Sequence, residues 1–254
     1  MDHGLWTNSD MPIAVLLDLD DTILDDSSAV EQCWKDACVA HRFECAGIDP
    51  AEVYAAVRRQ GDWFWSDPER HRLGRLDLDA ARTEVVRLSL AELGIETAGL
   101  AEKIAGTYGR QRDAVMQPLP DAIDTVRWFR EHGTKLALLT NGAADAQRRK
   151  IARFNLAGLF DCILVEGEVG FGKPDERIYR RALRELAVDP EDAWMVGDHL
   201  EFDVATPQKL GLFTVWIDVR GNGVPPDRDI RPDCIIRTLS ELRSGNISPG
   251  IATE

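Results

Sequence analysis

The most chemically informative stretch of the sequence is IAVLLDLDDTILDD at residues 13–26, where an apolar run ends in five carboxylates within nine positions. Adjacent carboxylates repel one another and resist desolvation, so folding alone does not call for such a cluster. Acidic residues also cap helix N-termini, and that role suits Asp25 and Asp26. Asp18 and Asp20 instead come at the end of a predicted strand. Because open α/β sheets bind ligands at this end of their strands, these two acids are candidates for catalysis.

Polar side chains also follow other predicted strands of the chain. Thr140 and Asn141 close the run LLTNG. After a later apolar run, the stretch GDHLEFD supplies Asp198 and Asp203. Because the carboxyl ends of parallel strands lie along one edge of a sheet, these side chains are expected to converge on Asp18. Acids that meet in this way can be ionised together only if a cation lies among them, and carboxylate oxygens suit Mg²⁺.

Each of these side chains also has an ordinary structural explanation. Thr140, Asn141 and Asp203 are residue types that cap helices. A lysine before a proline, such as Lys173 in GFGKPDERIY, is usually a solvated loop residue. Convergence on one edge of the sheet favours the functional interpretation of the set as a whole. Lys173 would also supply the local positive charge that an anionic substrate needs.

The elements that must position these residues are typical of an α/β fold. Apolar strands are predicted at residues 13–18, 135–142, 162–167, 193–198 and 212–219, with helices between the later ones. Strands that alternate with helices predict a parallel sheet with right-handed crossovers and helices on both faces. The strands are continuously apolar, which agrees with burial on both sides. We therefore predict a doubly wound, Rossmann-like parallel sheet.

The part of the chain after the first strand shows no strand signal and predicts an inserted all-helical domain. Helical patterns cover residues 78–94 and 98–116, and two more precede them. The predicted boundaries place the α/β core at residues 1–25 and 116–254 and the helical domain at residues 26–115.

Local signals predict where the first helices of this domain begin and end. Ser28 and Glu31 form a capping box, which predicts a helix through about Ala46. A second helix is predicted to begin after Asp49 and to stop at Gly61.

A loop is predicted next, at residues 62–76 (DWFWSDPERHRLGRL), because the stretch has mixed character and contains turn residues. Its aromatic and cationic side chains could together enclose the leaving group of an organophosphate. In the alternative, the aromatic rings pack the helical domain and the arginines pair with surface acids. The sequence favours neither, and the candidate specificity residues are Trp63, Trp65, Arg70, His71, Arg72 and Arg75.

The composition narrows the classes of partner. With a net charge of −14 and a pI near 4.8, the chain would repel nucleic acid and anionic membranes. Five scattered cysteines without CxxC spacing argue against a disulfide framework and a cysteine metal site. The start, MDHGLWTNSDMP, lacks the features of a signal peptide, and no apolar run approaches the length of a membrane span. We expect a cytoplasmic protein, and an anionic small substrate would need local positive charge at its site.

The motifs DLDDT, LLTNG, KP and GDHLEFD, in this order around a helical insertion, resemble those of the haloacid dehalogenase superfamily. The chain is most similar to the Mg²⁺-dependent phosphatases of that superfamily, which carry a helical cap after the first motif. The resemblance covers almost the whole chain, and four motifs in this order are very specific. It implies hydrolysis of a small-molecule phosphomonoester through an aspartyl-phosphate intermediate.

The resemblance also implies a role for each candidate residue. Asp18 would be the nucleophile that attacks phosphorus, and Asp20 would be the general acid/base. Mg²⁺ would be bound by Asp18, by the main-chain carbonyl of Asp20 and by Asp198. Residues that bind the phosphoryl oxygens or support the site would be Thr140, Asn141 (through its backbone amide), Lys173, Thr22 and Asp203.

Other functions are weighed against this one. A dehalogenase of the same superfamily needs the nucleophile but no acid two residues later, so Asp20 argues against it. Phosphonate hydrolysis would need a lysine from the cap, for which Lys35 is a poor candidate. A phosphomutase would use the same acids with a differently shaped cap. A phospho-accepting signalling domain has similar residues around Mg²⁺, but it is roughly half this length and has no helical insertion. The sequence indicates neither the substrate nor the oligomeric state.

Overall fold

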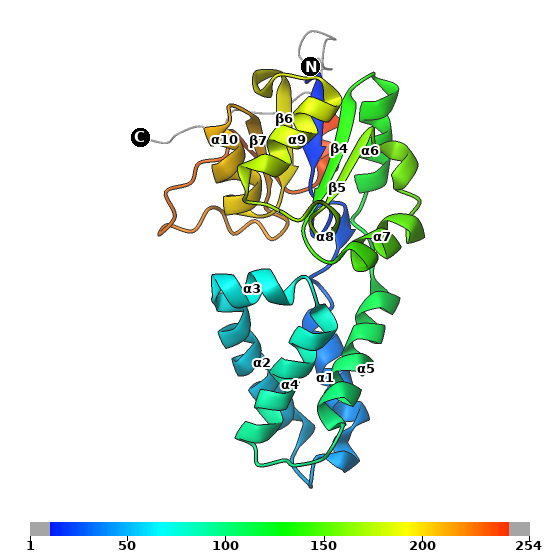
Figure 1. Ribbon diagram of the computed structural model, residues 1–254, viewed down its shortest axis with the longest axis vertical. Helices are drawn as coiled ribbons and strands as arrows, with labels where there is room; N and C mark the ends of the chain where they lie inside the picture. Colours follow the sequence, from blue (N-terminus) through cyan, green and yellow to red (C-terminus); the bar gives the residue numbers. More distant parts are fainter. Residues whose placement is uncertain (1–10, 244–254) are drawn as a thin grey trace. The chain divides into compact units, whose positions relative to one another are not determined.

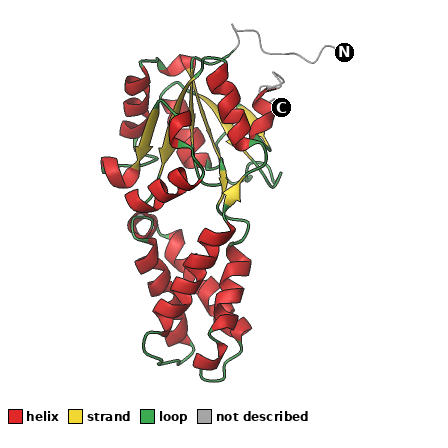
Figure 2. Ribbon diagram, turned by 90° about the vertical axis from the view of Figure 1, so that its right-hand side faces the viewer, coloured by secondary structure: helices red, strands yellow, loops and turns green. Residues whose placement is uncertain are grey.

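The computed structural model describes residues 11–243, and the chain forms two compact units (Figure 1). One unit contains the described residues up to Asp25 and from Gln117 onward, and the other spans Asp26–Met116. The first is an α/β unit and the second is built from helices (Figure 2). The first ten residues, which carry most of the stretch judged not to be a signal peptide, lie outside the described residues.

A six-stranded parallel sheet forms the centre of the α/β unit, in the strand order β5-β4-β1-β6-β7-β8. The chain begins at an inner strand and winds outward in both directions, which confirms the predicted doubly wound, Rossmann-like fold. The last strand was not predicted, because three residues are too few for a periodic signal. The strands are β1 (Ala14–Leu17), β4 (Lys135–Thr140), β5 (Cys162–Val165), β6 (Ala193–Gly197), β7 (Phe213–Ile217) and β8 (Cys234–Ile236).

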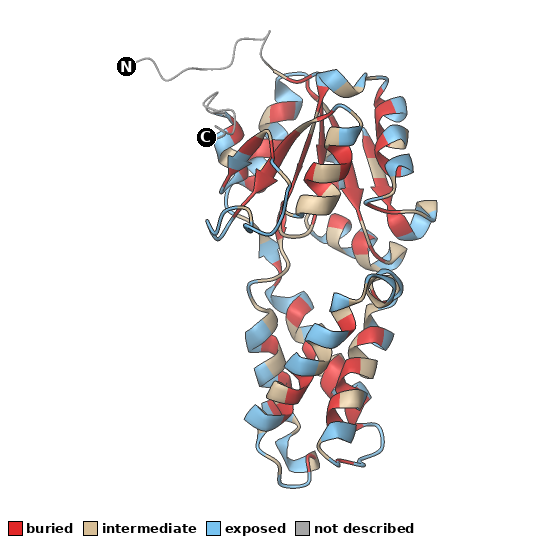
Figure 3. Ribbon diagram, turned by 90° about the vertical axis from the view of Figure 1, so that its left-hand side faces the viewer, coloured by how far each residue is buried: buried red, intermediate tan, exposed pale blue. Residues whose placement is uncertain are grey.

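Helices connect the strands and bury both faces of the sheet. Tyr179 packs with Leu16 and Leu139 in one buried cluster. Val15 and Leu138, which point to the opposite face, are fully buried as well, and Figure 3 shows burial along the strands. The connecting elements are α6 (Ala122–Glu131), α7 (Ala144–Arg153), α8 (Glu166–Val169), α9 (Glu176–Leu186), the π-helix η4 (Leu200–Ala205), α10 (Thr206–Lys209), and the short turns η2 (Ala157–Leu159), η3 (Pro190–Asp192) and η5 (Leu239–Arg243).

A small antiparallel ladder lies where the chain leaves the α/β unit and returns to it. β2 (Leu24–Asp25) pairs with β3 (Gln117–Pro118), so that Leu24 lies opposite Pro118. The outgoing and returning segments therefore run side by side.

The helical unit has its own core. The rings of Trp34 and Tyr108 stack with centroids 3.7 Å apart, and buried Arg112 pairs with Asp26 at 3.0 Å. No helix among residues 11–243 combines the length and the apolar character that crossing a membrane requires. The helices are α1 (Val30–Ala40), α2 (Pro50–Ser66), α3 (Pro68–Gly74), α4 (Leu78–Glu92) and α5 (Leu100–Val115), with a 3₁₀ turn η1 at Arg42–Glu44.

The first helix of this unit differs from its prediction at both ends. α1 begins after Ala29, which takes the N-cap position in place of Ser28, and it ends at Ala40. Ala46, the predicted end, has a φ of 53°. That left-handed conformation does not continue a right-handed helix, so the predicted helix length was wrong, and Ser28 is not the N-cap residue that the predicted capping box required.

The predicted loop at residues 62–76 was also wrong, because most of it is helical. α2 continues through Gly61 to Ser66. Phe64 is buried two turns after buried Val57 on the same helical face. Burying an aromatic side chain there outweighs the cost of a glycine inside a helix, which is about 1 kcal/mol.

A separate short helix, α3, follows directly. The carboxylate of Asp67 accepts a hydrogen bond from the main-chain amide of Arg70 at 2.8 Å, and Pro68 is the first helical residue. The aspartate-proline pair inside the predicted loop is therefore the start signal of a helix.

This capping contact can be tested by Asp67→Ala. The substitution removes the acceptor for the first turn of α3, so the free energy of unfolding should fall by about 1 kcal/mol. Urea unfolding followed by tryptophan fluorescence measures the change. The matched control is Asp62→Ala, because Asp62 is an exposed residue inside α2. Equal losses in the two variants would contradict the capping role of Asp67.

Candidate active site

The chain leaves β1 in a tight turn that carries Asp18 and Asp20. The main-chain amide of Asp18 donates to the carbonyl of Val196 at 3.0 Å, so Asp18 continues the pairing of β1 with β6. Asp21 then adopts a left-handed conformation with φ 58°, and its amide donates to the carbonyl of Leu24 at 2.7 Å. This reversal keeps both acids at the carboxyl edge of the sheet.

Lys173 reaches this edge from the segment after α8. Its Nζ donates to Oδ1 of Asp18 at 2.6 Å and to Oδ1 of Asp203 at 2.7 Å. Burial by itself lowers the pKa of Lys173, but the charges of the two carboxylates raise it above its ordinary value. The side chain is only 2% exposed, so the ammonium is a buried cation held between two acids.

Asn141 fixes the main chain at Lys173. Its Nδ2 donates to the carbonyl of Lys173 at 2.7 Å, and its Oδ1 accepts from the amide of Lys173 at 2.8 Å. The Asn141 side chain is thus committed to holding the lysine segment. Its main-chain amide is the group predicted to bind a phosphoryl oxygen.

Asp203 is fully buried and lies inside η4, not at its N-cap. Its Oδ2 accepts a hydrogen bond from the main-chain amide of His199 at 3.0 Å. A Cβ on Gly197 would come within 2.3 Å of the Asp203 carboxyl group. A glycine at this position is therefore what lets Asp203 approach the end of β6.

Within residues 11–243, Asp198, the remaining acid of the cluster, forms no ion pair of its own. Burial raises the pKa of Asp198 to about 9, and the charges of Asp18 and Asp203 contribute in the same direction. Among residues 11–243, no group donates a hydrogen bond to the Asp198 carboxylate. The pKa of Asp18 is also raised, to about 6, because burial outweighs the opposing charge of Lys173.

The three acids therefore carry more negative charge than one ammonium can offset. Oxygen atoms of Asp18, Asp198 and Asp203 lie within 4.8 Å of one another. Closely spaced carboxylate oxygens are ligands that Mg²⁺ prefers. Both carboxylate oxygens of Asp203 already accept hydrogen bonds, from Lys173 and from the main-chain amide of His199. Asp18 and Asp198 are therefore the better candidates for direct metal ligands, and Asp203 is a candidate for supporting the metal site.

Two residues at this site were missed by the sequence analysis. Gln147 and Lys150 of α7 donate to the two carboxylate oxygens of Asp20, at 2.8 and 2.7 Å. Gln147 also donates to Oγ1 of Thr140 at 2.6 Å, so Thr140 is joined to Asp20 through one amide. A glutamine one turn before Ile151, on the buried side of an amphipathic helix, is the signal that could have identified this contact.

Thr22 and the candidate specificity residues are not part of the acid cluster. Thr22 is buried, and its hydroxyl has no hydrogen-bond partner within the described part of the chain. The Arg70 guanidinium stacks 3.8 Å from the ring centroid of Trp63, and Arg72 forms two hydrogen bonds to Glu69. These contacts lie within the helical unit, and the specificity role stays a prediction. The candidate specificity residues are Trp63 and Trp65 in α2, Arg70, His71 and Arg72 in α3, and Arg75 after it.

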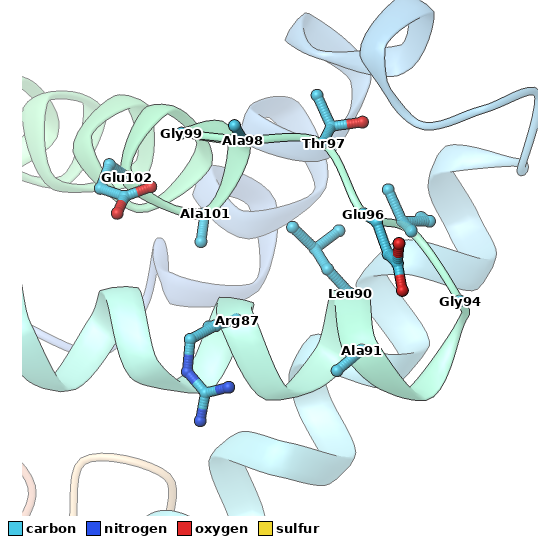
Figure 4. Close-up of a pocket in the computed structure, with 11 residues that line it drawn as sticks. Arg87, Leu90, Ala91, Gly94, Glu96, Thr97, Ala98, Gly99, Ala101 and Glu102 are labelled. Atoms are coloured by element: carbon cyan, nitrogen blue, oxygen red, sulfur yellow. The ribbon is translucent and has the colours of Figure 1, made fainter.

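A hollow of about 400 Å³ occurs in the helical unit, between the end of α4 and the start of α5 (Figure 4). Its charged lining residues, Arg87, Glu96 and Glu102, are exposed, and Arg87 is paired with Glu84. It holds no buried titratable group, unlike the edge of the sheet in the α/β unit.

Comparison with known proteins identifies relatives over most of the chain. Residues 14–211 match the haloacid dehalogenase-like hydrolases. The chain is 35% identical over 248 residues to a phosphoserine phosphatase of Thermus thermophilus, covering 90% of this chain and 96% of that protein. It is 29% identical over 243 residues to a glyceraldehyde 3-phosphate phosphatase of Methanopyrus kandleri, covering 90% and 97%. A solved 2-haloacid dehalogenase of Pseudomonas syringae has 28% identity and a TM-score of 0.60, covering 91% and 96%.

Asp198→Asn should weaken Mg²⁺ binding by at least about tenfold, because it removes a negative charge from the acid cluster. Isothermal titration calorimetry with MgCl₂ measures the affinity without any substrate. Asp161→Asn is the control, since Asp161 accepts a hydrogen bond from the Leu136 amide near the start of β4. Unchanged Mg²⁺ affinity in Asp198→Asn would exclude this carboxylate from the metal site.

Proposed function

Because the chain belongs to the haloacid dehalogenase-like hydrolase family, we propose that it hydrolyses a small-molecule phosphomonoester with Mg²⁺ through an aspartyl-phosphate intermediate. The observation that carries this proposal is a pair of acids, two residues apart, in different surroundings. Asp18 lies buried against Lys173, whereas Asp20 is held by Gln147 and Lys150. Two carboxylates in different environments can take two different roles.

In the first step, an oxygen of Asp18 attacks phosphorus while the bond from phosphorus to the ester oxygen breaks. Asp20 donates a proton to the departing alcohol oxygen. Lys173 stays charged beside Asp18 and offsets negative charge on the phosphoryl group. Asp18, Asp198 and the main-chain carbonyl of Asp20 would hold Mg²⁺, which would supply further positive charge near the phosphoryl oxygens.

In the second step, Asp20, now a carboxylate, takes a proton from water. The water oxygen forms a new bond to phosphorus as the bond to Asp18 breaks, which releases inorganic phosphate and regenerates both acids. Thr140 and the main-chain amide of Asn141 are the proposed donors to the phosphoryl oxygens, next to Lys173.

The substrate class rests on the relatives. Their names indicate phosphoserine and glyceraldehyde 3-phosphate as substrates of those proteins, so we place both in the first test panel. The helical domain, predicted at residues 26–115, is the proposed cap that selects the substrate. Five buried free cysteines agree with a reducing, cytoplasmic location.

A dehalogenase is the second candidate, because a 2-haloacid dehalogenase is among the similar solved structures. Such an enzyme has no need for Asp20 or for the acid cluster of Asp18, Asp198 and Asp203. The same acids leave a phosphomutase open, whereas a phospho-accepting signalling domain would have no use for the helical insertion. Phosphate release without transfer to a second hydroxyl separates hydrolysis from the mutase reaction.

Turnover should require a divalent cation. The protein should release phosphate from at least one ester of a panel of phosphorylated metabolites with MgCl₂, lose this activity in excess EDTA, and regain it when Mg²⁺ is restored. Asp18→Asn, which exchanges a carboxylate for a nearly isosteric amide, serves as the inactive control. Full turnover after chelation, or a loss of only about tenfold in Asp18→Asn, about 1.4 kcal/mol in barrier, would contradict the proposed mechanism.

Asp20→Asn should separate the two steps. The variant loses the general acid/base, so alkyl phosphates should be turned over about 10²–10⁴-fold more slowly. An aryl phosphate departs without a proton, so its first step should suffer less, and phosphoenzyme should accumulate on Asp18. A burst of released phenol, or added mass on the intact protein, reports the intermediate. Equal slowing of aryl and alkyl substrates with no intermediate would refute the role of Asp20.

A further inference from the structure

Two side chains of α7, Gln147 and Lys150, hold the carboxylate of Asp20. They are three residues apart, which places them on the same face of the helix. Nε2 of Gln147 lies 2.8 Å from Oδ2 of Asp20, and Nζ of Lys150 lies 2.7 Å from Oδ1. Both oxygens of Asp20 are therefore engaged by donors from one helix, which fixes the plane of the carboxylate as well as its position.

The burial of Gln147 is explained by its hydrogen bonds to residues of the site and not by apolar packing. Its side chain is 3% exposed, and a buried amide is costly unless its hydrogen bonds are made. Besides Asp20, its Nε2 lies 2.6 Å from Oγ1 of Thr140 and 2.7 Å from the carbonyl oxygen of Asn141. Ile151 is the only other side chain of α7 that is buried, and it is apolar. If position 147 served packing alone, an apolar residue like Ile151 would suit it equally well.

The contacts of Gln147 join groups with different proposed tasks. Asp20 would move the proton, and Thr140 would bind the phosphoryl group. An amide nitrogen carries two hydrogens, so the three oxygen acceptors around Gln147 share them. One side chain thus sets the position of the proton donor relative to the phosphoryl-binding hydroxyl.

We propose that Gln147 is the positioning residue of the general acid/base Asp20, and that Lys150 is its partner on the second carboxylate oxygen. The inference rests on the proposed function, because it concerns the step in which Asp20 protonates the leaving alcohol. Geometry controls such a step, since a displacement of about 1 Å can cost about 10²-fold in rate. Gln147 itself touches neither phosphorus nor the leaving group in this assignment.

Gln147→Met tests the proposal, because methionine has a similar length and removes the donors. The kcat for an alkyl phosphate should fall about 10–100-fold, with a smaller loss for an aryl phosphate, whose leaving group needs no proton. KM should change by less than about threefold, since Lys173 and the main-chain amide of Asn141, the other proposed phosphoryl-binding groups, are unaltered. If this variant does not fold, Gln147→Asn, which withdraws the amide by one methylene, replaces it.

The matched control is Gln208→Met. Gln208 also uses its Nε2 for two contacts, to the carbonyl of Arg231 at 2.8 Å and to Asp233 at 3.2 Å. Those contacts tie α10 to the segment before β8 and touch none of the proposed catalytic groups. This variant should lower the melting temperature at unchanged kcat. A general effect of losing a glutamine amide would instead lower kcat in both variants, and would overturn the inference.

A double-mutant cycle asks whether Gln147 acts through Asp20. In an Asp20→Asn background, Gln147→Met should reduce kcat further by less than about threefold, because the group that it positions is already gone. The full 10–100-fold loss in both backgrounds would show that Gln147 acts elsewhere.

For the second donor, Lys150→Met should reproduce the leaving-group dependence, and Lys150→Arg, which keeps a cationic donor, should recover most of the activity.

The outcomes separate this inference from the proposed function. A wild-type protein that releases no phosphate from any ester refutes the proposed function and the inference with it. An active wild type whose Gln147→Met variant keeps its kcat and its ratio of alkyl to aryl turnover refutes the inference alone.

Discussion

The rest of the site depends on two ion pairs, which the ammonium of Lys173 forms with the carboxylates of Asp18 and Asp203. A buried charge is tolerated only when it is paired, and removing one partner of such a pair typically costs about 3–5 kcal/mol. The surrounding residues serve this pairing. Asn141 holds the main chain of the lysine, and Gly197 leaves room for Asp203. The proposed nucleophile thus lies in a network that is also part of the structural core.

The order of the strands brings the partners of this pairing together. Asp18 follows β1, Asn141 follows β4, and Asp203 comes after β6, and these three strands are neighbours at the centre of the sheet. Side chains that are more than a hundred residues apart can meet there because parallel strands end at a common edge. The acid cluster that remains after Lys173 is paired is what suits a divalent cation.

This part of the arrangement could be predicted from the sequence. Continuous apolar runs identify buried parallel strands, and the polar residues that follow them must then lie at one edge. That reasoning is sufficient to bring together Asp18, Asp198 and Asp203, because it needs only the ends of the strands. Lys173 follows α8 and not a strand, so the ends of the strands alone do not place it. It also predicts the doubly wound sheet, although β8 is too short to be detected.

Contacts from helix faces could not be predicted in the same way. Gln147 lies in AADAQRRKIARF, which is so polar that its inward face is marked by little besides Ile151. Finding its contact with Asp20 requires the rotation of α7 about its axis, which only packing determines. The predicted end of α2 at Gly61 was wrong for a related reason. Gly61 and the Asp67-Pro68 pair look like a loop locally, but burial of Phe64 decides in favour of a helix.

The β2-β3 ladder has a consequence for how this chain can be rearranged. Leu24 and Pro118 are paired across it, although ninety-odd residues of sequence separate them. If the helical unit is treated as a loop of the α/β unit, the β2-β3 ladder holds the two ends of that loop together. The entropic cost of closing a loop grows only slowly with its length, so a longer or shorter insertion would change that cost little. Exchange of this segment for another of different length and chemistry would therefore leave the register of the six-stranded sheet untouched. The ladder makes the chain modular, with one junction at which the helical unit can change while the α/β unit stays as it is.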